Sequence, residues 1–302
     1  MPHNTPESAN DDLPAYIANI KHCKLLGIDA VENSEKSLVL VLPYSKNASS
    51  LDGSQALSGG AVLTLMDTVC GLVAAKAINH EGVAPTLNMI IDYIQPQTPG
   101  SSLLGTATTL RINETMLYSR GICYEAGNEE SPIAFCSGTF IRVDSSASQI
   151  MPVQVNNPEY ITFLTGLTKL PNDQTITALI NQSPYAQLLG IEAKKNRDQI
   201  LFILPACDRI IGNNTLPAVH GGCVAGFMEH AALLQAWSLN PAGTMPKAIN
   251  SAIDFLRPAR LVDSYATCEI MRRGRNVTNI NVTMWQTDID KRIATASINI
   301  FN

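Results

Sequence analysis

The sequence predicts a duplicated α+β domain in which each copy wraps an antiparallel sheet around one long, buried helix. The helices are expected at residues 57–75 and 219–237, where each segment opens on a Gly-Gly pair and carries a single carboxylate. A segment that is apolar on every face indicates a helix enclosed by other structure rather than one lying on the surface. Strand-like segments follow each helix in the same order, as expected when a sheet covers a helix.

The spacing of chemical groups defines the repeat. Gly59 and Gly221 are 162 residues apart (221 − 59), and Asp67 and Glu229 have the same separation (229 − 67). Burying a carboxylate without partners costs free energy, so an acid at the same place in both copies indicates a function. The alternative is a structural acid that caps a neighbouring helix or accepts backbone N–H bonds.

Length and composition set the domain organisation. The chain has 302 residues, of which 45% are hydrophobic and 16% charged, and this fits two domains with extensive buried cores. We expect the first domain at 13–143, a linker at 144–174 and the second domain at 175–302. A frayed tail is expected at 1–12, and a short helix within the linker at 158–167.

Charge and cysteine usage argue against several classes of function. The net charge is −5 without a large basic cluster, so neither a nucleic-acid nor an anionic-membrane surface is predicted. The start of the chain lacks the features of a signal peptide, and the longest apolar run is shorter than a membrane span. The 7 cysteines are scattered without a Cys-x-x-Cys pair, which is typical of reduced thiols in a cytoplasmic protein. No metal-ligand spacing is present, and no cofactor is predicted.

The segments before each central helix also repeat. Residues 13–26 have helical spacing and end at Gly27, a candidate C-cap. Residues 175–189 mirror that helix in the second half. Strands are then expected at 37–43 and 199–205, each preceded by Leu-Gly-Ile and ending in Leu-Pro.

The segments after each central helix read as antiparallel strands. They share the pattern Ile-Asp-aromatic-apolar-x-Pro, with Asp92 and Asp254 again 162 residues apart (254 − 92). In the first half, strands are expected at 86–96, 102–112, 116–125 and 133–143. In the second half, they are expected at 247–258, 264–273, 277–287 and 292–301.

The pattern Asn-x5-His-Gly-Gly-x6-acid occurs at 214–229 and is followed by a strand that ends aromatic-x-x-Pro. It resembles the motif of the hotdog-fold acyl-CoA thioesterases of the phenylacetate-pathway (PaaI-like) type. The resemblance covers nearly the whole chain, once in each half. It implies a fused tandem double hotdog, in which the two domains pair as an intrachain pseudo-dimer and their sheets join.

In that family the active site lies between two hotdogs, where the helix start of one faces the helix carboxylate of the other. The resemblance therefore implies a first composite site of Asp67, Thr86, Asn214, His220 and Gly221. Asp67 would act as nucleophile or general base, and the Gly221 backbone N–H would donate to the oxyanion. This agrees with physical expectation, since N–H groups at a helix start are free donors at the positive end of a dipole.

The resemblance implies a second composite site around Glu229 and Gly59. There Ser58 stands in place of the histidine, Asp52 in place of the asparagine, and Ala248 in place of the hydroxyl residue. Asp52 near Glu229 would also add like-charge repulsion. We therefore expect one working site and one degenerate site.

Substrate contacts are expected from Gly222 and from the cations that coenzyme A phosphates require, with Arg273 and Arg275 as the local candidates. Simpler interpretations stay open. His220 could brace its loop, Asn214 could be a turn residue, and Thr86 an ordinary strand residue. Likewise, Glu229 could be a structural acid, the glycines could serve helix packing, and the arginine turn could be a solvated surface.

Three activities compete for this sequence. The leading one is acyl-CoA hydrolysis, and its partners would be an acyl-CoA substrate and a second copy of the chain, giving a homodimer equivalent to a hotdog tetramer. A hotdog hydratase or dehydratase is the second, although its distinct Asp and His loop motif is not found. The third is a double hotdog that binds acyl-CoA, or only supports assembly, without turnover.

Overall fold

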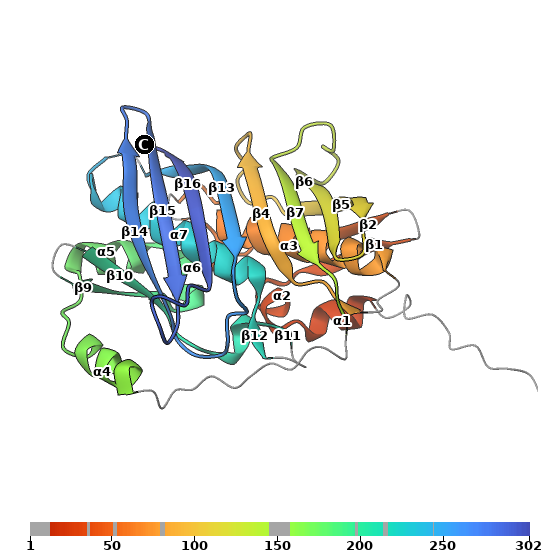
Figure 1. Ribbon diagram of the computed structural model, residues 1–302. Coiled ribbons are helices and arrows are strands. Elements are labelled where there is room, and N and C mark those ends of the chain that lie inside the picture. Colours follow the sequence, from red (N-terminus) through yellow and green to blue (C-terminus); the bar gives the residue numbers. More distant parts are fainter. Residues whose placement is uncertain are drawn as a thin grey trace, which may run out of the picture.

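The computed structural model describes residues 13–34, 37–50, 53–78, 82–144, 158–196, 199–213, 217–243 and 245–302. Two similar halves lie side by side, and their strands form one continuous antiparallel sheet in front of the two long helices (Figure 1). The duplicated α+β architecture that the sequence predicts is therefore confirmed.

The first half begins with helices and ends with the strands that cover them. Its helices are α1 (Leu13–Asn19), α2 (Lys21–Leu26), the short 3₁₀ turn η1 (Lys46–Ala48) and α3 (Gly59–Ala77). Its strands are β1 (Asp29–Asn33), β2 (Leu38–Leu42), β3 (Gly82–Val83), β4 (Thr86–Tyr93), β5 (Leu103–Ile112), β6 (Met116–Glu125), β7 (Ala134–Ile141) and β8 (Val143–Asp144).

The second half repeats this order after the linker helix α4 (Pro158–Leu167). Its helices are α5 (Gln174–Gln182), α6 (Pro184–Leu189), the 3₁₀ turn η3 (Asp208–Ile210) and α7 (Gly221–Ser238). Its strands are β9 (Glu192–Asn196), β10 (Gln199–Leu204), β11 (Ile211–Asn213), β12 (Ala218–Val219), β13 (Lys247–Phe255), β14 (Ser264–Arg273), β15 (Val277–Trp285) and β16 (Ala294–Phe301).

The two halves join at the centre of a 12-stranded sheet with the order β1-β2-β5-β6-β7-β4-β13-β16-β15-β14-β10-β9. Ile90 on β4 pairs with Ala252 on β13, its counterpart at an offset of 162 (252 − 90), so the pseudo-twofold axis passes between them. The Asn88 amide donates to Asp254 at 2.7 Å, and the Asn250 amide donates to Asp92 at 2.6 Å. This reciprocal pairing is the intrachain pseudo-dimer expected from the resemblance.

The central helices α3 and α7 pack against each other in opposite directions beneath the sheet. A Cβ atom added to Gly226 would lie 2.9 Å from the Gly60 Cα, and one added to Gly222 would overlap the Thr64 backbone. Glycine therefore lets the two backbones approach more closely than larger residues would allow. This close approach brings the start of each helix beside the middle of the other.

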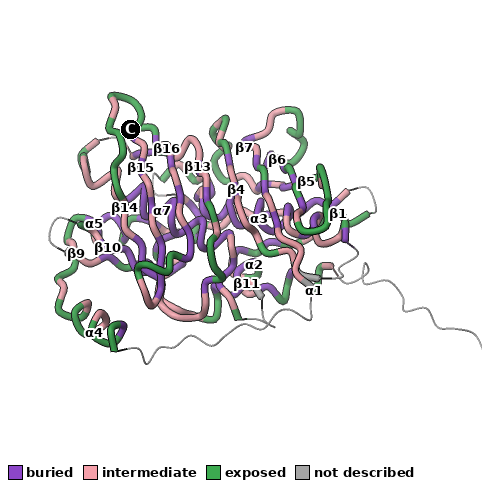
Figure 2. Tube along the Cα trace, viewed as in Figure 1, coloured by how far each residue is buried: buried purple, intermediate pink, exposed green. Residues whose placement is uncertain are grey.

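The core lies between the sheet and the central helices (Figure 2). Strand β16 alternates buried and half-buried residues, with the buried face toward α7, as expected for a sheet covered on one side. By length and composition alone, α3 could cross a membrane, but 72% of its most apolar window is buried inside the protein. Burial explains its apolar character without a bilayer.

The expected helix at 13–26 is interrupted. Ile20 is extended, with ψ of 102°, so α1 and α2 are separate helices, and Gly27 caps α2 with φ of 74° as predicted. In the second half, Ser183 caps α6 at the corresponding break, and Pro184 occupies the first turn. Each break redirects the second short helix so that its side chains point toward the central helices.

Two edge strands were not predicted. In β1 every residue is exposed or half-buried, so its sequence carries no apolar alternation, and it joins the sheet by backbone pairing with β2. Strand β9 occupies the opposite edge beside β10. Polar edge strands of this kind resist unwanted pairing between molecules but give little sequence signal.

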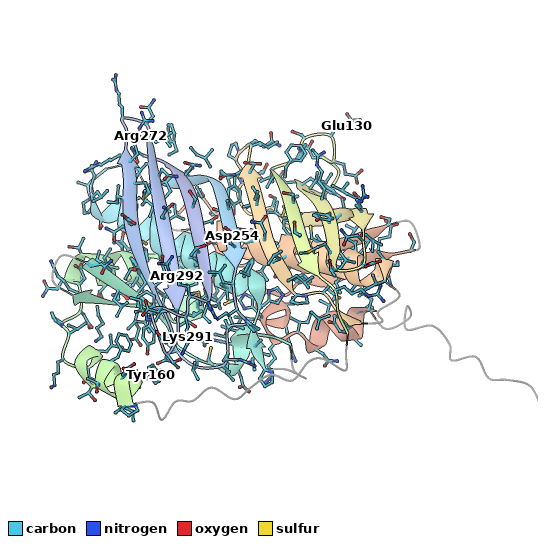
Figure 3. The ribbon with its side chains drawn as sticks, in the orientation of Figure 1. Glu130, Tyr160, Asp254, Arg272, Lys291 and Arg292 are labelled. Atoms are coloured by element: carbon cyan, nitrogen blue, oxygen red, sulfur yellow. The ribbon has the colours of Figure 1, made fainter. Side chains whose placement is uncertain are left out.

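The linker helix α4 lies where the sequence predicts it, near one corner of the sheet (Figure 3), and packs against β10, β14 and β15. Tyr160 is buried there, and the Phe163 ring meets Tyr265 edge-on at 4.9 Å between centroids. Trp285 completes this apolar cluster. The domain boundaries at 143 and 175 remain predictions.

Candidate active site

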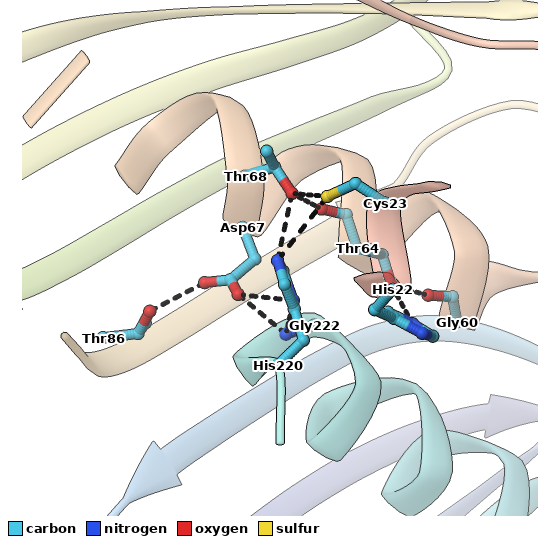
Figure 4. A network of polar contacts seen from close by, with 9 residues as sticks. All are labelled: His22, Cys23, Gly60, Thr64, Asp67, Thr68, Thr86, His220 and Gly222. Atoms are coloured by element: carbon cyan, nitrogen blue, oxygen red, sulfur yellow. Dashed lines mark hydrogen bonds and ion pairs between the residues drawn. The ribbon is translucent and has the colours of Figure 1, made fainter. Parts of the chain in front are cut away.

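Asp67 lies in the middle of α3 and accepts hydrogen bonds from both halves of the chain (Figure 4). Its Oδ1 accepts from the Thr86 hydroxyl at 2.7 Å, at the start of β4. Its Oδ2 accepts from the Gly222 backbone N–H at 2.7 Å, in the first turn of α7. The side chain is only 6% exposed. The carboxylate is therefore a partnered, buried acid at a composite site, as the resemblance implies.

Gly221 makes the close approach of this carboxylate possible. A Cβ at this position would lie 2.7 Å from Asp67 Oδ2, which is closer than a carbon and a carboxylate oxygen can pack without displacement. Gly221 is the first residue of α7, and no described residue accepts a hydrogen bond from its N–H. The site thus offers a backbone donor with no acceptor among the described residues, beside a fixed carboxylate.

His220 is the N-cap of α7 and lies against the same carboxylate. Its Nδ1 accepts from the Gly222 N–H at 3.0 Å and lies 3.3 Å from Asp67 Oδ2. Burial lowers the pKa of His220, and the nearby Asp67 charge only partly opposes that effect. A neutral imidazole is therefore favoured at neutral pH.

Sequence reasoning missed two residues that lie behind His220, Thr68 and Cys23. The Thr68 hydroxyl lies 3.3 Å from His220 Nε2, and the Cys23 sulfur lies 3.3 Å from that hydroxyl. One turn earlier on α3, the Thr64 hydroxyl lies 3.2 Å from His22 Nε2. The available signal was two threonines four residues apart in an otherwise apolar helix.

Other expected residues lie elsewhere or outside the described residues. Asn214 and Asp52 fall outside the described residues, so their positions are not assigned. Arg273 ends β14 and Arg275 lies in the turn before β15, and Figure 3 shows the neighbouring Arg272 at the outer tip of this hairpin. The structure therefore does not bring the two arginines to Asp67.

The two arginines instead line a pocket of about 300 Å³ at the far end of α7, together with Trp237 and Asn302. Fifteen residues (237 − 222) separate Trp237 from Gly222, which corresponds to about 22 Å along a helix. The Trp237 indole N–H is buried without a partner among the described residues. No described residue forms an ion pair with either guanidinium.

Glu229 occupies the corresponding position of the second site, but its surroundings differ. Its Oε2 accepts from the Ser251 hydroxyl at 2.6 Å and the Tyr93 hydroxyl at 3.0 Å. Burial raises the pKa of Glu229 to about 7, against the opposing effect of the two hydroxyl donors. A Cβ on Gly59 would overlap Glu229 Oε1, so the glycine–carboxylate approach is kept in both sites.

Sequence reasoning missed both hydroxyl partners of Glu229, because it expected Ala248 in place of the hydroxyl residue. Ala248 brings no hydroxyl, and Ser251, three residues further along β13, takes that place. The Ser58 side chain forms no cap bond to α3, whereas His220 caps α7. The Tyr93 hydroxyl instead lies against the helix start, 3.1 Å from the Gly59 carbonyl oxygen. The Tyr93 hydroxyl thus lies between the Glu229 carboxylate and the start of α3.

The profile described as the thioesterase superfamily matches the chain twice, at residues 55–129 and 216–293. Each match contains one Gly-Gly pair and the carboxylate of the helix that follows it, Asp67 or Glu229, and together the matches cover half of the chain. The chain belongs to the thioesterase superfamily. Its tandem hotdog fold, with two hotdog domains joined through their sheets, follows from this duplicated match and from the sheet topology.

Solved structures share the fold across most of the chain. A candidate thioesterase from Novosphingobium aromaticivorans is 14% identical with a TM-score of 0.62, and the alignment covers 90% of this chain and 97% of that one. A candidate thioesterase II from Thermobifida fusca is 10% identical with a TM-score of 0.61, covering 93% and 98%. A hotdog-fold protein of unknown function from Alicyclobacillus acidocaldarius is 10% identical with a TM-score of 0.58, covering 95% and 97%. None of the curated proteins compared with the chain matches it.

Proposed function

We propose that this protein hydrolyses acyl-CoA thioesters of the kind handled by PaaI-like enzymes, at the composite site around Asp67. The observation that carries the proposal is the pairing of a fixed carboxylate with the free N–H of Gly221 at a helix start. A thioester carbonyl placed between them would meet a donor on its oxygen and a base or nucleophile beside its carbon. Membership of the thioesterase superfamily supports hydrolysis of thioesters in general.

The oxyanion is the species that the helix start would stabilise. Attack on a thioester moves negative charge onto the carbonyl oxygen, and the N–H of Gly221 lies at the positive end of the α7 dipole. Removal of one such donor in other enzymes costs about 3 kcal/mol in the barrier. Glycine at this position also leaves room for an acyl group to approach the backbone.

Asp67 would work in one of two ways. As a general base it takes a proton from water, the water oxygen bonds to the carbonyl carbon, and the departing thiolate recovers the proton. As a nucleophile it forms a mixed anhydride and releases thiolate, and water then cleaves the anhydride. A single turnover in ¹⁸O-labelled water separates the two, because only the anhydride route can place label in the Asp67 carboxylate.

Arg273 and Arg275 are proposed to contact the phosphates of coenzyme A, although they lie far from Asp67 along α7. Coenzyme A carries its thiol and its phosphates at opposite ends of a long flexible arm, which suits widely separated contacts. The two guanidiniums in this pocket form no ion pair with a described residue, and they match an anionic ligand. Arg273→Ala combined with Arg275→Ala should raise KM for acyl-CoA but not for the same acyl group on N-acetylcysteamine.

The test of the activity is thiol release from short, medium, long and aryl acyl-CoAs by the whole chain. Hydrolysis of at least one class supports the proposal, and loss of the enoyl conjugation absorbance without thiol release would indicate a hydratase. If folded protein binds acyl-CoA and releases no thiol from any of them, the proposal fails and a binding protein is the better account.

A further inference from the structure

Behind His220, the hydrogen bonds of Thr68 determine where the imidazole carries its proton. The Thr68 hydroxyl donates its only hydrogen to the Thr64 backbone carbonyl at 2.7 Å, one turn back on α3. Its oxygen can then only accept, and His220 Nε2 lies 3.3 Å from it. The Nε2 atom must therefore carry the hydrogen in this contact.

The other ring nitrogen faces the carboxylate with its lone pair. His220 Nδ1 accepts from the Gly222 N–H at 3.0 Å, so it holds no hydrogen of its own. The same N–H reaches Asp67 Oδ2 at 2.7 Å, and Nδ1 and Oδ2 lie 3.3 Å apart. Two acceptors thus share one donor, and a proton taken up by Oδ2 would find Nδ1 ready to accept its hydrogen bond.

Cys23 and His22 on α2 are the titratable groups that face His220 from outside α3, and Asp67 faces it from α3. Burial raises the pKa of Cys23 to about 12, so it stays a thiol whose sulfur lies 3.3 Å from the Thr68 oxygen and 3.8 Å from His220 Nε2. Burial lowers the pKa of His22 to about 3, so its ring stays neutral at 5.6 Å from the His220 ring. Neither of these two neighbours therefore changes its charge between pH 5 and 9.

We propose that Thr68 is a positioning residue that holds His220 in the Nε2–H form, so that the Nδ1 lone pair receives the hydrogen of protonated Asp67 during turnover. The proposal rests on the proposed hydrolysis, in its general-base form. Water gives its proton to Asp67 Oδ2 while its oxygen bonds to the carbonyl carbon. The carbon–sulfur bond then breaks, and the thiolate takes the proton from Asp67. The products are the carboxylic acid and the thiol of coenzyme A, and Asp67 and His220 return to their starting protonation states.

The chain supplies a matched control for Thr68. Thr64 makes the same two contacts one turn earlier, because its hydroxyl donates to the Gly60 carbonyl at 3.0 Å and lies 3.2 Å from His22 Nε2. Thr68→Val and Thr64→Val remove the same atoms from the same helix. Only Thr68→Val removes the hydroxyl that contacts His220 Nε2.

The experiment compares pH profiles of kcat/KM and kcat for wild type, Thr68→Val, Thr68→Ser and Thr64→Val. In Thr68→Val the ring can move its hydrogen to Nδ1 and donate to the Asp67 carboxylate, which favours the ionised form. The acid limb should then shift to lower pH, with kcat about tenfold lower and KM nearly unchanged, as expected for a weakened general base. Thr68→Ser should restore the wild-type kcat and the wild-type position of the acid limb. Thr64→Val should leave the acid limb of the pH profile where it is in wild type.

The ¹⁵N spectrum of His220 gives a readout that does not depend on turnover. Wild type should show the Nε2–H tautomer, and Thr68→Val should lose it. The proposal is overturned if wild type shows the Nδ1–H tautomer, if the acid limb of Thr68→Val does not move, or if Thr64→Val moves it equally. Failure of the proposed hydrolysis would appear separately, as wild type that releases no thiol while its tautomer remains measurable.

Discussion

Asp67 in the first half of the chain accepts a hydrogen bond at 2.7 Å from the backbone N–H of Gly222 in the second half. This contact joins the middle of α3 to the first turn of α7, and it exists only because the two domains pair within one chain. Glu229 and Gly59 repeat the approach on the other side of the pseudo-twofold axis. The two sites share a backbone frame, and their side chains decide which of them can work.

Substitution of Gly221 by alanine should remove most activity. Its Cβ would lie 2.7 Å from Asp67 Oδ2 and would push the carboxylate away from the helix start. Because the carboxylate and the oxyanion donor would both be disturbed, we expect kcat/KM to fall by about 100-fold or more, corresponding to about 3 kcal/mol. Gly166→Ala is the control, since nothing lies within 4 Å of its added Cβ. Equal activity of Gly221→Ala and wild type would contradict the close approach.

Loss of the Thr86 hydroxyl should weaken the hold on Asp67 without unfolding the protein. Thr86→Val keeps the shape of the side chain but removes the donor to Oδ1 at 2.7 Å. Hydrogen bonds to charged groups contribute about 1.5–3 kcal/mol, so kcat should fall by about 10- to 100-fold. Thr86→Ser should retain most of the rate. Steady-state kinetics would argue against this role if valine and serine behaved alike.

Glu229 should make the stability of the protein depend on pH. Its pKa is raised from 4.5 to about 7 on folding, so the folded state holds this proton more tightly than the unfolded state. The associated stability is complete below pH 4.5 and is lost as the pH rises to about 7. The shift corresponds to roughly 3 kcal/mol.

The measurement is denaturant unfolding of wild type and Glu229→Gln at several pH values from 4.5 to 8. Glutamine does not titrate, so the difference in unfolding free energy between the two proteins isolates Glu229. The variant should gain stability relative to wild type as the pH rises. A difference that stays constant over this range would rule out a raised pKa at this position.

Tyr93 should matter for stability at the second carboxylate and not for turnover at the first. Tyr93→Phe removes a hydroxyl that contacts Glu229 at 3.0 Å and the Gly59 carbonyl at 3.1 Å, and it recreates the residue found at the equivalent Phe255. Leaving a buried group without its partner costs about 1–3 kcal/mol. Thermal melting should therefore shift downward while kcat stays within about twofold of wild type. A large loss of kcat in Tyr93→Phe would contradict this prediction, because it would show that turnover at Asp67 depends on the second site.

The central helices and the sheet were predictable because their signals are local. The 162-residue spacing located both helices and both carboxylates, and alternation located the strands that cover them. The cross-chain contact of Asp67 with the start of α7 was implied by the family resemblance. It could not be deduced from either segment alone, because it depends on how the halves pair.

What the sequence did not predict depends on tertiary packing. Cys23 reaches Thr68 only because the helix at 13–26 breaks at Ile20 and turns α2 toward α3. Ser251 donates to Glu229, although its counterpart at the 162-residue offset is Met89, so the repeat gave no signal for this contact. Arg273 and Arg275 lie far from Asp67 because they line the pocket at the far end of α7, which continues to Ser238. The spacing of the motif does not give the distance between the arginines and Asp67.

The central claim is that one carboxylate, Asp67, carries the hydrolysis. Its most direct test is thiol release from the best acyl-CoA by wild type, Asp67→Asn and Glu229→Gln, with thermal melting of all three. Asp67→Asn should lose turnover by about 100-fold or more, while Glu229→Gln should keep most of it. If folded Asp67→Asn retains wild-type turnover, or if Glu229→Gln alone abolishes it without loss of folding, the assignment of the active site to Asp67 is wrong.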